Sequence, residues 1–261
     1  MGKPTRMPPE NSRRGNPSTA QFIRRSFDTY YRDRERTRRM DVLNSQFVQP
    51  GGLTFDIGAH VGDRTGSFLR LGSKVVALEP QPELFRALGL LYGRNPDVAL
   101  QRVAAGAVAA SSVLHVNAHN LTVSTLSSDF IEAASTAAEW HGERWDQTIK
   151  VDVTTLDALI DLHGMPDFVK IDVEGHELEV LRGLSAPVRA LCFEFTTICR
   201  SVAYDCLELL QRLGDYRFNF SLGEEHCLRH HDWLDGRELA EELSALSDAA
   251  NSGDVFARLS P

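Results

Sequence analysis

The chain has 261 residues and a formal net charge of −8, and this length is sufficient for one large domain with a full hydrophobic core. The charge is unevenly spread, because residues 1–40 contain 11 Lys/Arg and 4 Asp/Glu, a net charge of +7, so the rest of the chain carries −15. Such an anionic body disfavours nucleic acid as the main partner, since neutralised phosphates supply most of the affinity in that kind of binding. The four cysteines lack the repeated spacing of a zinc site.

The N-terminal segment carries no pattern typical of export. Its first residues lack an apolar core, and no apolar run in the chain approaches membrane-spanning length. We therefore expect a cytoplasmic protein without a membrane partner. Residues 1–18 are rich in Pro, Arg, Ser, Gly and Asn and have almost no bulky apolar side chain to bury, which predicts a disordered basic arm.

Residues 19–47 place aromatic and apolar side chains at roughly helical spacing among Arg and Asp. This pattern predicts an amphipathic helical extension that lies on the main domain, residues 48–261. Five arginines fall between residues 32 and 39, and Asp33 and Glu35 partly balance them. They indicate a solvated helix face, with contact to an acidic partner as the alternative.

The segment Thr54–Gly62 (TFDIGAHVG) and the run Val75–Leu78 that closes on Glu79 predict a strand, a glycine turn, a helix and a second strand. This is the layout of a nucleoside-binding βαβ unit. Gly58 and Gly62 lack a Cβ, so the backbone can turn sharply and lie against a ligand. Glu79 follows Asp56 by 23 positions, close to the roughly 20-residue separation at which an acidic residue meets ribose hydroxyls.

The loop spacing is Asp-x-Gly-x-x-x-Gly, whereas a dinucleotide site requires Gly-x-Gly-x-x-Gly to bring a helix N-terminus onto a pyrophosphate. An acidic residue before the first glycine repels phosphate but suits the positive amino group and sulfonium of S-adenosylmethionine. The residues therefore favour a methyl donor over NAD, with Asp56, Gly58, Gly62 and Glu79 as cofactor-binding candidates. The alternative is an ordinary glycine-rich turn of an α/β protein.

The rest of the chain predicts further helices and strands in alternation. Short apolar runs are typical of buried parallel strands, and seven strands with intervening helices predict a doubly wound α/β sheet. A short additional strand is expected over 113–116, and a hydroxyl-rich, loosely helical stretch over 117–145 is expected to cover a pocket. Beyond the first two strands, the predicted elements of the main fold are helix 84–92, strands 98–103, 168–171, 190–195 and 216–220, helix 235–246 with a capping box, and strand 255–259.

Acidic residues and a histidine directly follow the strand predicted over 168–171, at the edge where such sheets bind ligands. Asp172 is placed to bind the amino group of the donor or a reacting hydroxyl. His176 is our first candidate for a general base, because an imidazole titrates near working pH; the alternative is a surface helix residue. Glu174 is a second candidate base, and simple helix N-terminal capping is the alternative for Glu174 and Glu177.

Two weaker site predictions concern a metal and the acceptor. Asp172, Glu174 and His176 could together hold a divalent cation that polarises the acceptor hydroxyl, although metal dependence is not favoured. Glu194, at the end of a strand on the same rim, is a candidate for the acceptor pocket; the alternative is a buried carboxylate paired with an arginine. The hydroxyl residues Thr122 and Ser124 are further acceptor candidates, or ordinary loop residues.

The motifs FDIGAHVG (55–62), ALEP (77–80) and especially VKIDVEGHELEVLRG (169–183) resemble the signatures of FkbM-type S-adenosylmethionine-dependent methyltransferases. The match extends over about residues 53–195. The resemblance implies a class I methyltransferase fold with an antiparallel last strand over 254–259, and methyl transfer to a hydroxyl. His60 stands where this family usually has Asn, so hydrogen bonding within the cofactor loop is expected to differ.

These observations predict an S-adenosylmethionine-dependent O-methyltransferase that acts on a small metabolite, natural product or sugar. One alternative is a nucleic-acid or protein methyltransferase guided by the basic N-terminal arm. Another is a non-catalytic module that binds S-adenosylmethionine. The identity of the acceptor and the oligomeric state cannot be read from the residues.

Overall fold

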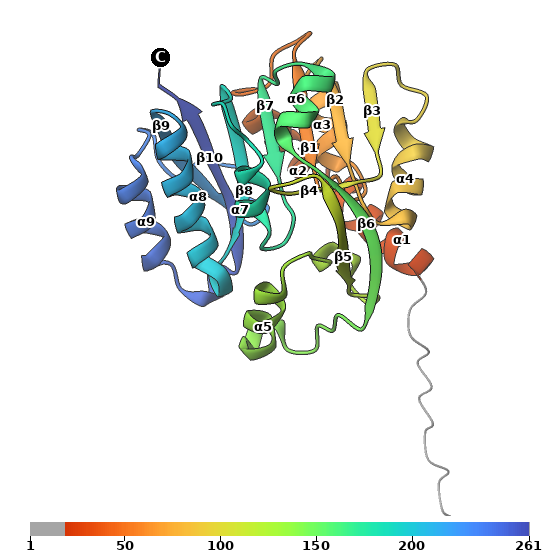
Figure 1. Ribbon diagram of the computed structural model, residues 1–261. Coiled ribbons are helices and arrows are strands. Elements are labelled where there is room, and N and C mark those ends of the chain that lie inside the picture. The colour runs from red at the N-terminus through yellow and green to blue at the C-terminus, as the bar shows by residue number, and fades with distance from the viewer. Residues whose placement is uncertain (1–18, 261) are drawn as a thin grey trace, which may run out of the picture.

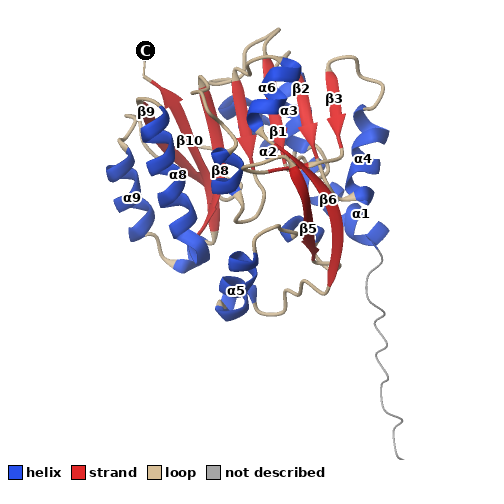
Figure 2. Ribbon diagram, viewed as in Figure 1, coloured by secondary structure: helices blue, strands red, loops and turns tan. Residues whose placement is uncertain are grey.

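The structure is a computed structural model that describes residues 19–260. The disorder predicted for residues 1–18 therefore lies outside the described residues. A seven-stranded sheet forms the centre of the molecule, with helices on both of its faces (Figure 1; Figure 2). A second, three-stranded sheet and the helix α5 (Ser128–Thr136) lie beyond one end of the central strands.

The central sheet has the strand order β3-β2-β1-β7-β8-β10-β9. Strands β3, β2, β1, β7 and β8 are parallel, whereas β10 is antiparallel to both of its neighbours. The class I methyltransferase fold and its antiparallel last strand are thereby confirmed. The strands are β1 Leu53–Ile57, β2 Lys74–Leu78, β3 Val98–Gln101, β7 Phe168–Ile171, β8 Ala190–Thr196, β9 Tyr216–Leu222 and β10 Ser252–Leu259.

Two layers of helices bury the faces of this sheet. One face packs against α6 (Leu156–His163), α7 (Glu177–Arg182), α8 (Arg200–Leu213) and α9 (Gly236–Ala245). The other face packs against α3 (Asp63–Arg70), α4 (Pro82–Tyr92) and the residues around the end of α2 (Arg34–Asn44). Because both faces are covered, a central strand such as β7 is buried at all four positions, which is why its sequence is almost continuously apolar.

The N-terminal extension consists of two helices, α1 (Thr19–Tyr31) and α2. Asp33 separates them, because it has an extended backbone and its side chain accepts hydrogen bonds from the backbone N–H groups of Glu35 and Arg36 as the N-cap of α2. Phe22 of α1 is buried against the small sheet and α4, and Leu43 of α2 is buried in the main core. The extension therefore packs closely on the rest of the protein.

The small sheet has the order β4-β6-β5, formed by β4 (Ala104–Ala105), β5 (Ala110–Val116) and β6 (Gln147–Thr154). The short strand predicted over 113–116 is thus longer than expected. The strand predicted over 98–103 ends at Gln101, and the chain resumes in β4. Between β5 and β6 lie α5 and two short 3₁₀ turns, Leu121–Val123 and Ala138–Trp140; two further 3₁₀ turns are Thr197–Cys199 and Asp248–Ala250.

None of the helices in the described part of the chain combines the length and the apolar character that crossing a membrane requires. The capping box predicted at the start of α9 is present, because Asp235 accepts from the backbone N–H of Glu238 while the side chain of Glu238 accepts from that of Asp235. Helices α6 and α8 and strand β6 were not predicted from the sequence.

Candidate functional site

A cleft opens at the carboxyl ends of β1, β2 and β7, between the main sheet and the small sheet. This is the edge at which open parallel sheets bind ligands. The loops after these three strands supply most of the polar side chains. Other parts of the wall come from the N-terminal extension, the small sheet and residues 122–126. The polar residues that line it are Tyr30, Arg36, His60, Asp63, Arg64, Glu79, Gln81, Thr122, Ser124, Lys170, Asp172, Glu174, His176 and Glu224.

The two glycines of the first loop have different surroundings. Gly58 lines the cleft with φ 81°, and a Cβ placed on it would lie 1.9 Å from the carbonyl oxygen of Asp172. The loops after β1 and β7 can therefore approach each other only without a side chain here. Gly62 has φ 83°, and its Cβ would lie 2.6 Å from the ring of Tyr92 on α4. Gly62 thus shapes the start of α3 and is not part of the cleft wall.

Asp56, the first cofactor candidate, is fully buried beneath this loop and does not line the cleft. Its Oδ2 accepts a hydrogen bond of 2.5 Å from the hydroxyl of Thr65, and its Oδ1 lies 3.6 Å from the ammonium nitrogen of Lys170. The same ammonium donates to the carbonyl of Gly58 at 3.1 Å and pairs with Asp172 at 3.1 Å. Asp56 therefore reaches the cleft only through Lys170, a residue that the sequence analysis missed.

The pKa values of this group follow from its surroundings. Burial raises the pKa of Asp56, although Lys170 opposes the shift. Burial alone would lower the pKa of Lys170, but Asp172 and Asp56 outweigh it and the pKa is raised. Lys170 is therefore an ammonium ion near pH 7. A lysine within the otherwise apolar run FVKI was the one sequence signal for it.

Glu79 lies where the sequence analysis placed it, at the end of β2 on the cleft wall, and is only 3% exposed. Its two carboxylate oxygens accept hydrogen bonds from the backbone N–H groups of His60 at 3.0 Å and Gln81 at 2.8 Å. Burial nevertheless raises its pKa to about 7. Each oxygen keeps a further lone pair, so the carboxylate can also accept from a ligand hydroxyl.

His60 connects the cofactor loop to the N-terminal extension. Its ring meets Tyr30 of α1 edge-on at 5.6 Å between centroids, and Nε2 lies 3.4 Å from the hydroxyl of Ser26. Burial lowers its pKa to about 4, so the ring is neutral near pH 7. The residue has φ 50°, a left-handed conformation that a non-glycine residue adopts at some cost.

The segment after β7 brings Asp172, Glu174 and His176 to the cleft, as predicted from the sequence. Burial lowers the pKa of His176, which stands at the N-cap position of α7, so the imidazole is neutral near pH 7. Glu177 is buried and accepts from the backbone N–H groups of Val173 and Gly175. These two N–H groups belong to the turn that precedes α7, so Glu177 holds that turn and does not cap the helix itself.

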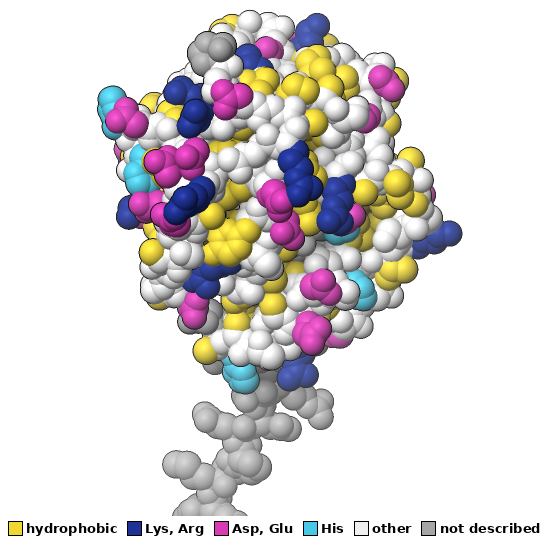
Figure 3. Space-filling view, turned by 60° about the vertical axis from the view of Figure 1, so that its left-hand side comes forward, with side chains coloured by type: hydrophobic (Ala, Val, Ile, Leu, Met, Phe, Trp, Pro, Cys, Tyr) yellow, Lys and Arg dark blue, Asp and Glu magenta, His cyan; other side chains and the backbone are white. Residues whose placement is uncertain are grey.

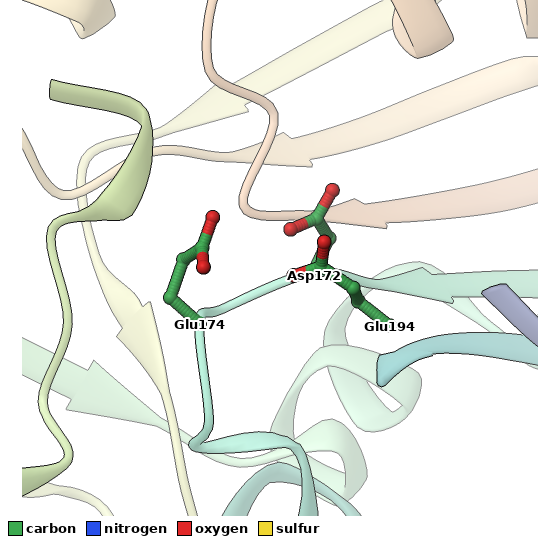
Figure 4. Close-up of side chains that lie close together, drawn as sticks. All are labelled: Asp172, Glu174 and Glu194. Carbon is green, nitrogen blue, oxygen red and sulfur yellow. The ribbon is translucent and has the colours of Figure 1, made fainter. Parts of the chain in front are cut away.

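Glu174 makes no such bond. It is 6% exposed and has φ 56°. Burial, followed by the neighbouring charge of Asp172, raises its pKa well above the usual range. The metal group considered from the sequence also differs, because the third carboxylate beside Asp172 and Glu174 is that of Glu194, while His176 is not part of the group (Figure 4). Glu194 lies on β8 and is not among the residues that line the cleft.

Thr122 and Ser124 lie on the side of the cleft that the small sheet and its loops form. The hydroxyl of Ser124 donates to the side-chain oxygen of Gln81 at 3.1 Å, and the side-chain nitrogen of Gln81 donates to the carbonyl of Leu121 at 3.1 Å. These bonds tie the 3₁₀ turn Leu121–Val123 to the loop after β2. Ser124 therefore fixes the position of this wall, and Thr122 is the freer of the two hydroxyls to meet a ligand.

A buried ion-pair network that sequence reasoning missed closes the side of the cleft next to α2. Arg36 donates to Asp63 at 2.8 Å and to Glu224 at 2.8 Å, and its guanidinium lies 4.9 Å from the centre of the Tyr30 ring. Arg64 donates to Asp254 at 2.8 Å. Because Arg36 and Glu224 are 188 positions apart, only the fold brings them together.

Comparison with known proteins agrees with this architecture. The family model of the FkbM methyltransferase domain matches residues 56–220. The hexuronic acid methyltransferase AglP of Haloferax volcanii is 23% identical over 183 residues, which cover 69% of this chain and 70% of that protein.

Among solved structures, the chain is similar to the precorrin-6y C5,15-methyltransferase of Geobacter metallireducens, with TM-score 0.43, 15% identity, and coverage of 85% of this chain and 86% of that chain. An S-adenosylmethionine-dependent O-methyltransferase of Thermotoga maritima has TM-score 0.43 and 12% identity, and the match covers 94% of this chain and 72% of that chain. The match of the family model over more than half of the sequence, on a seven-stranded sheet with an antiparallel last strand, shows that the chain belongs to the FkbM family of S-adenosylmethionine-dependent methyltransferases.

Proposed function

We propose that this methyltransferase transfers a methyl group to a hydroxyl of a small metabolite, natural product or sugar. The observation that carries the proposal is that one cleft contains both Glu79, suited to a ribose, and His176, a neutral imidazole suited to accept a hydroxyl proton. The relative that is named a hexuronic acid methyltransferase supports a sugar as the acceptor.

The donor end of the cleft consists of the loops after β1 and β2. S-Adenosylmethionine supplies an electrophilic methyl group on a positively charged sulfur. Glu79 would accept from its ribose hydroxyls, and Asp172 would attract its amino group. Gly58 leaves the backbone free to lie against the ligand. Asp56 and Lys170 would act beneath these contacts, because they hold the loops after β1 and β7 in place.

The acceptor end consists of the segment after β7 and the wall at Thr122. Methyl transfer requires mainly that the acceptor oxygen is held close to the methyl group and in line with it, and such positioning contributes roughly 7–11 kcal/mol. A hydroxyl is a poor nucleophile until its proton is taken. His176 is the first candidate base, since burial lowers its pKa and keeps the ring ready to accept that proton. Glu174 is the second.

The nucleic-acid alternative finds little support on the face shown in Figure 3. On the face shown in Figure 3, basic side chains lie among acidic ones, and neither sign forms a continuous patch. In the described part of the chain, several arginines are paired with an acidic neighbour on the same helix, as Arg212 is with Glu208 and Arg237 with Glu241. A surface that binds nucleic acid would instead gather its Lys and Arg on one face.

The proposal is tested by incubating the full chain with methyl-labelled S-adenosylmethionine and a panel of sugars, uronic acids and a cell extract, with the labelled product identified by mass. Label on a hydroxyl oxygen of a small molecule is expected. The variant Glu79→Gln should reduce labelling at low donor concentration, because it removes a carboxylate of the donor site. Label recovered only in nucleic acid or protein would contradict the proposal, and so would donor binding without transfer to any acceptor.

A further inference from the structure

We propose that Asp172, Glu174 and Glu194 form a binding site for a divalent metal cation at the inner end of the cleft. Each residue offers one carboxylate oxygen, and these oxygens all lie within 4.8 Å of one another. Figure 4 shows the three side chains converging on the same space from the end of β7, the following turn and β8. The role of this cation rests on the proposed function, but its binding does not.

Two of the three carboxylates, those of Glu174 and Glu194, lack a hydrogen-bond donor within residues 19–260. Glu174 is 6% exposed, and no hydrogen bond from any of residues 19–260 reaches its carboxylate. The buried Oε2 of Glu194 likewise has no hydrogen-bond partner in the described part of the chain. An arginine partner, which the sequence left open for Glu194, is therefore not found there. Buried carboxylates are costly unless a cation or donors compensate them, so their arrangement indicates a ligand.

The charges around the three carboxylates are mostly negative. Lys170 pairs with Asp172 and with the buried Asp56, so this ammonium already faces two carboxylates. The further charges that act on Glu194 are those of Glu177 and Asp254, both acidic. An added cation would bind in a region of net negative charge, where attraction to it is strong because water is largely excluded.

All three ligand atoms offered by the site are carboxylate oxygens. Three carboxylates without a thiolate or an imidazole suit a hard, oxygen-preferring cation such as Mg²⁺ or Mn²⁺. Such ions keep some coordination positions for water or substrate. Because Asp172 and Glu174 line the cleft, a ligand in the cleft can reach those positions. A cation there would hold the acceptor hydroxyl and lower its pKa, and His176 would then take the proton.

The backbone conformation of Glu174 also favours the proposed site. It occupies the left-handed region with φ 56°, where a residue with a Cβ is disfavoured. Its carbonyl accepts a hydrogen bond of 2.7 Å from the hydroxyl of Thr125, a residue that also pairs with β5. The strained turn is thus held from the small sheet, and it directs the Glu174 side chain toward Asp172 and Glu194.

Binding is tested by titrating the full chain with Mn²⁺ and following free Mn²⁺ by electron paramagnetic resonance. We expect one site per chain, from which Mg²⁺ displaces Mn²⁺. Glu194→Gln and Glu174→Gln should each weaken binding by about 10-fold or more, since ligand charge sets the affinity of such sites. Both variants should fold, because glutamine keeps the size of glutamate and neither carboxylate makes a hydrogen bond within residues 19–260; circular dichroism checks this.

The matched control is Glu179→Gln, which neutralises a carboxylate on α7 that is paired with Arg182 and lies outside the group. It should bind Mn²⁺ as the wild type does. Absence of a stoichiometric site, or equal affinity in wild type and Glu194→Gln, would overturn the proposal. If methyl transfer persists unchanged in EDTA and no Mn²⁺ binds, the cation site is refuted and the proposed function stands. If Mn²⁺ binds but no acceptor is methylated, the cation site stands and the proposed function is refuted.

Discussion

The ammonium nitrogen of Lys170 lies 3.1 Å from Oδ2 of Asp172, and this ion pair links the buried centre of the sheet to the wall of the cleft. On its inner side the same ammonium faces Asp56 at 3.6 Å. Between them it donates to the carbonyl of Gly58. One side chain in the middle of the sheet therefore fixes the ends of β1 and β7, two of the three strands whose carboxyl ends form the cleft.

Replacing Lys170 with methionine leaves Asp56 buried and without a counter-ion. We expect the free energy of unfolding to fall by about 3–5 kcal/mol, as for other broken buried ion pairs. The measurement is urea denaturation at pH 7. The double variant Lys170→Met with Asp56→Asn removes both charges and should recover a large part of the loss. A double variant as unstable as the single one would show that the ion pair is not the cause.

Gly58 and Gly51 provide a matched pair for the close approach of the two loops. Both have left-handed backbones, with φ 81° and 77°, so alanine at either site costs roughly 1–2 kcal/mol in backbone strain. A Cβ at Gly51 meets nothing within 4 Å, whereas at Gly58 it would lie 1.9 Å from the carbonyl of Asp172.

Gly58→Ala should therefore destabilise the protein clearly more than Gly51→Ala, and it alone should weaken the binding of S-adenosylhomocysteine. Thermal denaturation and calorimetry measure the two effects. Equal losses in both variants would mean that the loops after β1 and β7 can separate without cost.

The parts of the fold that could be predicted from the sequence are those whose burial leaves a simple pattern. Strands β2 and β7 are covered on both faces, so their runs VVAL and FVKI stand out as apolar. Strand β6 belongs to a small sheet and is mostly exposed or half-buried, so its sequence QTIKVDVT lacks that signal. Helix α8 was missed although its buried residues Ala203, Cys206, Leu207 and Leu210 have helical spacing.

The candidate site divides in the same way. Residues that follow a strand end, such as Glu79 and His176, could be placed at the cleft because parallel strands share one carboxyl edge. Contacts between distant segments could not be predicted, and the pair of Arg36 with Glu224 is an example. The burial of each side chain could not be predicted from the sequence either. Asp56 and Glu79 are both acidic residues near the end of a predicted strand, yet only Glu79 lines the cleft.

Glu79 should make cofactor affinity depend on pH. Its pKa is raised to about 7, and its ionised form is the better acceptor for ribose hydroxyls, so affinity for S-adenosylhomocysteine should fall as the pH drops from 8 to 6. Without ligand, stability should change in the opposite direction. A raised carboxyl pKa means that the folded state disfavours the charge, so stability declines as the pH rises from about 4.5 to 7.

The measurement is calorimetric titration between pH 6 and 8.5, with urea denaturation of the free protein over pH 4.5–8. Glu79→Gln should bind more weakly by about 1–3 kcal/mol above pH 7. In Glu79→Gln, the affinity for S-adenosylhomocysteine should also lose much of its dependence on pH. Affinity that is independent of pH in the wild type would argue against contact between this carboxylate and the ribose.

His176 should control the rate and leave donor binding unchanged. As the base, it must be neutral, and because burial lowers its pKa from 6.5, the acid limb of kcat should lie below pH 6.5. His176→Asn should reduce kcat by about 10²–10⁴-fold and remove that limb, with little change in affinity for S-adenosylhomocysteine. The control is His231→Asn, at a fully exposed imidazole. If His176→Asn keeps the wild-type pH profile, Glu174 becomes the first candidate base.

Arg36 should couple the N-terminal extension to the cleft. Arg36→Ala leaves Asp63, whose side chain is only 11% exposed, without one of its two guanidinium neighbours, so we expect a loss of about 3 kcal/mol in the free energy of unfolding and weaker cofactor binding. Although burial opposes it, Arg64 and Arg36 lower the pKa of Asp63 below 3.8. This stabilisation is therefore present above about pH 4 and is lost on further acidification.

Urea denaturation at neutral and acidic pH tests this prediction. The difference between wild type and Arg36→Ala should be largest near pH 7 and should shrink below pH 3.8, where carboxylates become protonated. Arg38→Ala is the control, because that side chain is 71% exposed and, among residues 19–260, pairs only with Glu35 on the same helix, so its loss should cost less than about 1 kcal/mol. Equal losses in the two variants would show that the extension is held by its apolar contacts, through Phe22 and Leu43, and not by the ion-pair network.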